Sequence, residues 1–132
     1  MTTSACAALL WGAAAACAEV GGLQFEDGQS CRVNEIPLGS PARIDARRED
    51  ARVSVNVAAN YGCQTSAGRA RAEDRDGELR LFADTILPAY PTPACKCTRH
   101  LSFRFELQDR GGRRVVFVKD GRVEGEGRLE PQ

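Results

Sequence analysis

The chain has 132 residues, which is enough for one domain with a hydrophobic core and too few for two. Its 18 acidic and 18 basic side chains cancel, and no stretch collects charges of one sign over more than a few residues. The sequence therefore disfavours a nucleic-acid-binding protein and a protein held to anionic membranes by its overall charge.

The first segment resembles an export leader. Residues 1–18 carry no charged side chain, and residues 5–18 are almost entirely Ala, Leu, Cys and Trp. This run is too short for a transmembrane helix, which needs about 20 apolar residues, but it fits the apolar region of a signal peptide. Because Ala16-Cys17-Ala18 fits a small-x-small cleavage site, we expect a signal peptide over 1–18 and a single mature domain over 19–132.

Two other interpretations of the leader stay open. In the first, Ala14-Ala15-Ala16-Cys17 is a lipobox, which gives a leader over 1–16 and a lipidated Cys17 at the mature N-terminus. In the second, the segment is a buried N-terminal helix. We favour export and expect an extracytoplasmic protein, periplasmic, secreted or lipid-anchored, without a transmembrane segment in its mature chain.

Export would place the cysteines in an oxidising compartment. Cys6 and Cys17 belong to the leader, so the mature domain keeps four cysteines: Cys31, Cys63, Cys95 and Cys97. An even number of cysteines in an oxidising compartment predicts two disulfides.

The mature domain has the periodicity of strands. Its apolar residues recur at every second position, and turn residues interrupt the chain at short intervals, so we expect no helix. This pattern predicts an all-β domain of about seven or eight short antiparallel strands folded as an immunoglobulin-like β-sandwich. In chain order, the expected extended segments are 23–25, 31–33, 42–47, 51–59, 68–73, 79–83, 101–107, 115–118 and 123–129.

Three of these segments locate the core. Val53, Val55 and Val57 share one face of a strand, and a slip of one residue would turn all three to water. Residues 115–118 are apolar on both faces, as in a central strand. In the segment 101–107 the inward residues are expected to be Leu101, Phe103, Phe105 and Leu107.

Two Asp-Gly pairs, at 76–77 and 120–121, predict tight hairpins, because both residues of such a turn need a positive φ. The acidic residues of 74–78 also have some similarity to a calcium loop. The further ligands that such loops place downstream are missing, so we favour the hairpin.

The most distinctive stretch is Cys95-Lys96-Cys97. Prolines at 88, 91 and 93 precede it and predict a stiff connection that crosses from one sheet to the other. In an extended chain, side chains two residues apart point to the same face, so Cys95 and Cys97 form a paired feature.

Four thiols allow three disulfide connectivities. A bond between Cys95 and Cys97 would close a very small ring, whereas disulfides need Cα atoms about 4.4 to 6.8 Å apart. We therefore expect Cys31 and Cys63 each to take one cysteine of the pair, and the sequence leaves the choice open. A bond from Cys63 into the pair closes a loop of roughly thirty residues and is worth about 3 to 4 kcal/mol in the chain-entropy account.

A metal site is the alternative use of the same residues. Cys95, Cys97 and His100 supply two soft ligands and an imidazole, and Cys63 would complete a tetrahedral zinc site or a thiolate site for copper(I). Cys-x-Cys is not the usual zinc spacing. A redox-active cysteine pair is a third alternative, but no helix N-terminus is expected beside it to lower a thiol pKa. We favour structural disulfides and expect no cofactor.

Catalytic residues are not apparent. His100 is the only histidine, and no nucleophile motif surrounds it. The acidic residues look like solvated strand faces and turns. We expect a protein that is not an enzyme.

The stretch Asn60-Tyr61-Gly62-Cys63, together with Cys95-Lys96-Cys97 and the following strand, resembles a pattern of small exported bacterial proteins and lipoproteins of unassigned function. There, an Asn and a Cys end one strand and a Cys-x-Cys opens another. The resemblance covers about half of the chain, has no place for Cys31, and implies a secreted sandwich-like domain without an activity.

Two functional hypotheses follow. The first is an exported, disulfide-stabilised, non-catalytic module of the cell envelope that binds a protein or a surface component. The alternative is a periplasmic zinc- or copper-binding protein that uses Cys95, Cys97 and His100.

Overall fold

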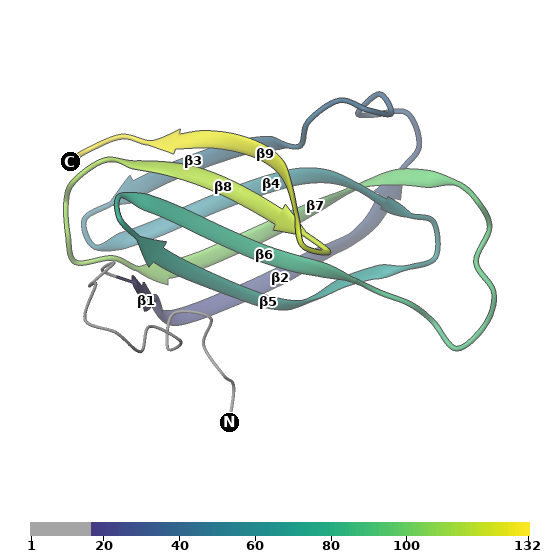
Figure 1. Cartoon of the computed structure of the whole chain (residues 1–132), viewed down its shortest axis with the longest axis horizontal. Helices are drawn as coiled ribbons and strands as arrows, with labels where there is room; N and C mark the ends of the chain where they lie inside the picture. The colour runs from purple at the N-terminus through teal and green to yellow at the C-terminus, as the bar shows by residue number, and fades with distance from the viewer. Residues whose placement is uncertain (1–16) are drawn as a thin grey trace.

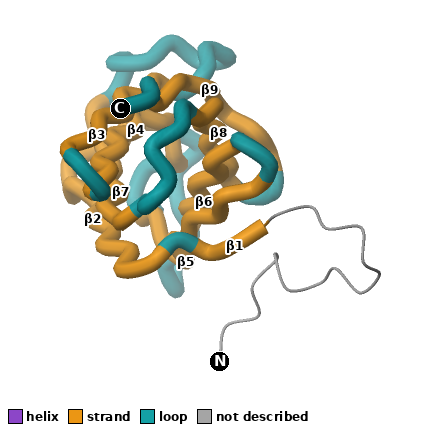
Figure 2. The backbone as a smooth tube through the Cα atoms, turned by 90° about the vertical axis from the view of Figure 1, so that its left-hand side faces the viewer, coloured by secondary structure: helices purple, strands orange, loops and turns teal. Residues whose placement is uncertain are grey.

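The structure of the protein, a computed structural model, describes residues 17–132, so residues 1–16 of the signal peptide predicted over 1–18 lie outside the described residues. In the described part, nine strands form two sheets that pack face to face (Figure 1; Figure 2). The predicted all-β sandwich is confirmed, and these residues contain no helix. No helix long and apolar enough to cross a bilayer occurs within residues 17–132.

The larger sheet has five strands in the order β1-β5-β6-β8-β9. Their bounds are β1 (Cys17–Glu19), β5 (Ser66–Arg75), β6 (Glu78–Ile86), β8 (Arg113–Lys119) and β9 (Arg122–Leu129). The four-stranded sheet has the order β2-β7-β4-β3. Its strands are β2 (Gly21–Arg32), β7 (Lys96–Glu106), β4 (Arg52–Gly62) and β3 (Arg43–Glu49).

One pair of neighbours departs from the expected antiparallel pattern. Strands β6 and β8 are parallel, because β7 lies between them in the chain but belongs to the other sheet. Immunoglobulin sandwiches order their strands ABED and CFG. The orders found here follow a different pairing, so the immunoglobulin-like part of the prediction is not confirmed.

The core lies between the sheets and is formed by the inward side chains, which occupy every second position of the strands. Val53, Val55 and Val57 of β4 are at most 1% exposed, as their alternation predicts. Phe103 of β7 packs edge-on against Phe117 of β8, with ring centroids 6.3 Å apart, so the aromatic contact joins the two sheets. Both faces of β8 are buried, which fits its predicted central position.

The two Asp-Gly pairs form the predicted hairpins. Asp76 and Gly77 connect β5 to β6 with φ values of 49° and 79°, and Asp120 and Gly121 connect β8 to β9 with 50° and 78°. Two successive positive φ values define the turn type whose twist matches that of the flanking strands.

The sandwich has two distinct ends (Figure 1). The loops 33–42, 63–65 and 87–95 and the turn 120–121 lie at one end, which we call the disulfide end. The turns 50–51 and 76–77, the loop 107–112, β1 and the C-terminus lie at the other, the opposite end.

Strands β3 and β9, the outer strands of the two sheets, meet along one side of the sandwich. The Ala42 amide donates to the Glu124 carbonyl at 2.7 Å, which joins the backbones across the sheets. A Cβ atom at Gly125 would lie 2.5 Å from the Ala42 carbonyl oxygen, and one at Gly127 would lie 2.9 Å from the Ile44 side chain. These glycines permit the close approach of β3 and β9.

We expect Gly125→Ala to destabilise the domain by about 1 to 3 kcal/mol, because the added methyl meets backbone that cannot move aside cheaply. The loss should exceed the small entropic gain from removing a glycine. Urea unfolding checks this. Gly21→Ala is the matched control, since a Cβ there meets nothing within 4 Å, and equal stability of the two variants would contradict the close approach.

Candidate functional site at the disulfide end

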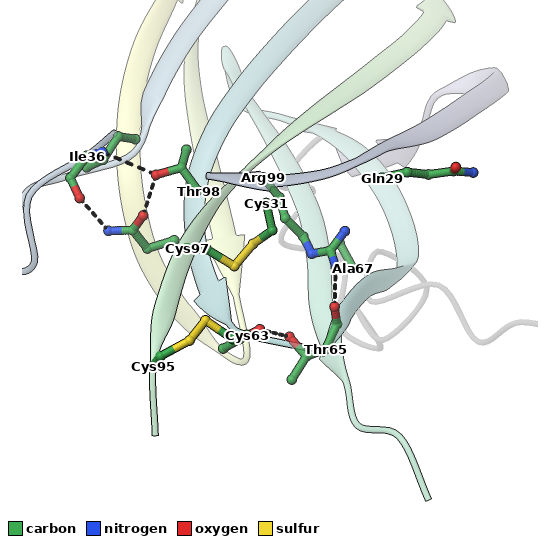
Figure 3. The surroundings of a disulfide bond; sticks show 12 residues. Gln29, Cys31, Ile36, Cys63, Thr65, Ala67, Cys95, Cys97, Thr98 and Arg99 are labelled. Atoms are coloured by element: carbon green, nitrogen blue, oxygen red, sulfur yellow. Dashed lines mark hydrogen bonds between the residues drawn. A yellow bond between two sulfur atoms is a disulfide. The ribbon is translucent and has the colours of Figure 1, made fainter. Parts of the chain in front are cut away.

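Two disulfides join the four predicted cysteines (Figure 3). Cys31 bonds Cys97 with Cα atoms 5.1 Å apart, and Cys63 bonds Cys95 with Cα atoms 5.4 Å apart. Cys31 and Cys63 thus each take one cysteine of the Cys-x-Cys pair, and the predicted disulfide bonds are confirmed. The bonds close chain segments with sequence separations of 66 and 32 residues.

Both bonds lie within the four-stranded sheet, at the start of β7. Cys31 belongs to β2 on one side of β7, and Cys63 directly follows β4 on the other side. The Cys63 amide also donates to the Cys95 carbonyl at 2.9 Å, which continues the β4–β7 ladder. The central strand β7 is therefore fixed covalently to both of its neighbours where the polypeptide enters it.

A buried ion pair joins the two sheets at this end. The Arg99 guanidinium, 8% exposed, contacts both carboxylate oxygens of Asp27 at 2.9 and 3.0 Å and donates to the Thr65 carbonyl. Asp27 also accepts from the Ala67 amide of β5 at 3.1 Å. Asp27 and Arg99 belong to the four-stranded sheet and Ala67 to the other, so this network connects the sheets without a covalent bond.

Asp27 lies on the inward face of β2 with Leu23 and Phe25, and an irregularity in the strand follows it. The register with β7 shifts between Asp27 and Cys31, and Gln29 has a φ of 66°. A Cβ at Gly28 would lie 2.8 Å from the His100 carbonyl oxygen. The bulge therefore depends on a glycine that lets β2 pass close to β7.

Tyr61 provides a second link between the sheets. Its hydroxyl donates to the Ala83 carbonyl of β6 at 2.7 Å, and the side chain is fully buried. Burial raises the pKa of Tyr61 above its usual range, so the phenol stays neutral and keeps this hydrogen bond.

Asn60 holds the loop 33–42 in place. Its amide nitrogen donates to the Ile36 carbonyl at 3.0 Å, and its amide oxygen accepts from the Thr98 hydroxyl at 2.6 Å. The same hydroxyl accepts from the Ile36 amide at 3.2 Å, and the Ile36 side chain is buried. The loop is thus bonded to β4 and β7 through polar side chains.

The residues of the metal hypothesis do not form a metal site. The sulfur atoms of Cys63, Cys95 and Cys97 are in disulfides, which leaves no thiolate to act as a ligand. His100 lies on the outer face of β7, half exposed, with Nε2 2.6 Å from Glu35. Within residues 17–132, no group of three or more His, Cys, Asp or Glu side chains is arranged to hold a metal ion.

The disulfide end also carries exposed apolar side chains. Among the described residues, every large hydrophobic side chain that is exposed lies on the loops or the turn of this end or directly beside them: Val33, Leu38, Leu87, Tyr90 and Val123. Leu38 and Val123 border a shallow hollow of about 390 Å³ whose rim also carries Lys96, Lys119 and Glu124.

Known proteins supply no relative for this chain. No protein-family model, no curated protein and no solved structure matches it. The assignment of a function therefore depends on the geometry of the molecule.

Sequence patterns identified the cysteines but missed their polar surroundings. Asp27, Asn60 and Arg99 come from three separate strands, and nothing in their local pattern marks them. For Arg99 one signal was present, since it lies two residues before Leu101 and therefore on the same inward face of β7.

We expect the four disulfide-bonded cysteines of the exported protein to alkylate only after reduction. Cys97 is buried whereas Cys63 and Cys95 are partly accessible, so a mild reductant should open the Cys63–Cys95 bond first. Intact mass before and after alkylation, followed by peptide mapping, measures both points. Alkylation of unreduced protein, or opening of the Cys31–Cys97 bond first, would contradict this arrangement.

Replacing Arg99 with Met should destabilise the domain by about 3 kcal/mol or more, because the Asp27 carboxylate then remains largely buried without its cation. Arg110→Met, at an exposed arginine of the opposite end, should change stability by less than about 0.5 kcal/mol. Chemical denaturation of both variants provides the measurement. If the double variant Arg99→Met/Asp27→Leu loses the full sum of the single losses, the two side chains are not coupled.

Proposed function

We propose that the protein is an exported, disulfide-stabilised, non-catalytic module of the cell envelope that binds another protein through its disulfide end. The observation that carries this proposal is the one-sided distribution of exposed apolar side chains, which lie at the disulfide end and not at the opposite end of the described domain. Single exposed apolar residues are ordinary on protein surfaces, but their collection on one set of loops is typical of interaction surfaces.

The loops that carry these side chains are held in fixed positions. Loop 33–42 is bonded through Asn60, and loop 87–95 contains three prolines and ends in the Cys63–Cys95 disulfide. A loop that is already ordered loses less conformational entropy when it binds. Rigid loops that display Leu38, Leu87 and Tyr90 therefore support the binding of a preformed protein surface.

The hollow beside Leu38 supports a partner of particular chemistry. Its walls combine the exposed side chains of Leu38 and Val123 with the ammonium groups of Lys96 and Lys119. Lys119 is already 3.6 Å from Glu124, which leaves Lys96 as the freer cation. An apolar side chain next to a carboxylate on the partner would complement this surface.

Two disulfides in a small domain are typical of an oxidising, extracytoplasmic compartment. Strand β1 supports the lipoprotein form of export. Cleavage before Cys17 would leave β1 whole, whereas cleavage before Glu19 would remove two of its three residues. Cys17 pairs with Arg75 at the opposite end, so a lipid there would leave the disulfide end facing away from the membrane.

The absence of catalysis is part of the proposal. His100 is paired with Glu35, which also lies 3.4 Å from Arg43, on the outer face of the four-stranded sheet. The contact of His100 with this carboxylate supports a structural role for the histidine.

We expect the double variant Leu38→Ser/Tyr90→Ala to bind the envelope partner at least about tenfold more weakly, because interface energy concentrates in a few apolar and aromatic anchors. The partner is first captured on the immobilised exported protein from the envelope fraction of the producing cell. It is then purified, and its dissociation constant is measured by titration.

Glu130→Ser, an exposed change at the opposite end, is the control and should bind as the parent does. Equal affinity of the two variants would place the interface elsewhere. Failure to capture any protein partner from the envelope fraction would also contradict the proposal.

A further inference from the structure

A second surface, on the outer face of the four-stranded sheet, has the composition of an anion site. Ser54 of β4 and Ser102 of β7 are short outward side chains on the two central strands, and longer side chains surround them, including Arg52 and Arg104 on the same two strands. The resulting depression reaches a volume of about 710 Å³ near the opposite end of the sheet. Ser54 forms part of its floor.

Three arginines surround Ser54. Arg47 of β3 and Arg104 of β7 are its direct neighbours on the two sides, and Arg52 precedes it by two residues on the same face of β4. Side chains in directly paired positions start about 4.5 to 5.5 Å apart. The three side chains therefore start from adjacent positions around Ser54, and all three line the depression.

The charge of this depression is positive, although the chain as a whole is neutral. Four arginines and two glutamates line it, and Asp45 pairs with one of these arginines, so the excess is one positive charge. That arginine, Arg47, contacts Asp45 through Nη2 at 3.2 Å and through Nε at 3.3 Å. The side chains of Arg52 and Arg104 are exposed and form no ion pair or hydrogen bond with the described residues, so their donors point to solvent.

The chemistry of the lining indicates the class of ligand. Among the described residues, the aromatic side chain at an outward position of these four strands is His100, which pairs with Glu35 and does not line the depression. Phe105 lines the depression but is buried, so no exposed aromatic ring is available there for stacking on a sugar ring or base. Guanidinium donors from three sides, with a hydroxyl at the centre, fit an oxyanion whose oxygens point in several directions better than a planar carboxylate.

We propose that Arg47, Arg52 and Arg104, grouped around Ser54, bind the phosphate group of a surface glycan or of a lipid head group. This site is separate from the disulfide end, so its failure in a test would leave the proposed protein-binding function unaffected.

The test is a titration of the exported, processed protein, followed by the backbone amide NMR signals of Ser54 and Arg104. Inorganic phosphate, glucose 1-phosphate and vesicles containing phosphatidylglycerol are the probes, and acetate is the planar reference. We expect saturable shifts with the phosphate probes, weaker binding at high ionic strength, and little response to acetate. Tighter binding of glucose 1-phosphate would assign a glycan, and tighter binding of the vesicles a lipid.

Arg104→Gln and Arg52→Gln should each weaken phosphate binding about tenfold, because each removes charge-assisted hydrogen bonds. Arg128→Gln is the matched control, since Arg128 is an exposed arginine of β9 in the other sheet. Unchanged thermal unfolding of the three variants verifies their folding. Absence of saturable shifts, equal loss in Arg128→Gln, or equal binding of acetate would overturn the site.

Discussion

The structure depends on how β7 is held where it begins. This strand lies between β2 and β4, supplies the centre of the core through Phe103, and crosses from the prolines of the preceding loop into the sheet. Two disulfides fix it to both neighbours, and the buried Arg99 then connects it to the opposite sheet through Asp27. Disulfides thus hold β7 to its two neighbours in one sheet, and the Asp27 carboxylate of the buried ion pair accepts a hydrogen bond from the Ala67 amide of the other sheet.

The other end of the sandwich uses a second buried arginine. Arg113 of β8 bonds Asp74 of β5 through two nitrogens at 2.8 and 3.1 Å and reaches Asp109 at 2.9 Å. Hydrogen bonding to Asp74, more than any other contact, raises the pKa of Arg113 above its usual range. The arginines therefore divide into two groups: Arg99 and Arg113 are enclosed and structural, whereas those around Ser54 are exposed and available to a ligand.

Most of the fold follows from local patterns in the sequence. Alternation placed Val53, Val55 and Val57 in the core, and the Asp-Gly pairs formed hairpins because their φ requirement is local. The parallel pairing of β6 with β8 was not predictable, since it results from the sheet that β7 joins. The arginine cluster around Ser54 could not be predicted from the sequence for the same reason. Its members lie on β3, β4 and β7, and only the strand order makes them neighbours.

The contact between β3 and β9 bears on how the protein behaves at high concentration. An outer strand exposes unpaired amides and carbonyls that can recruit a strand from another molecule and begin a fibrillar aggregate. Here the outer strands of the two sheets cover each other along one side, and the amide of Ala42 is occupied by Glu124. On the other side, the bulges of β2 break the regular register that an incoming strand would need. Once folded, the protein is thus a poor template for its own aggregation.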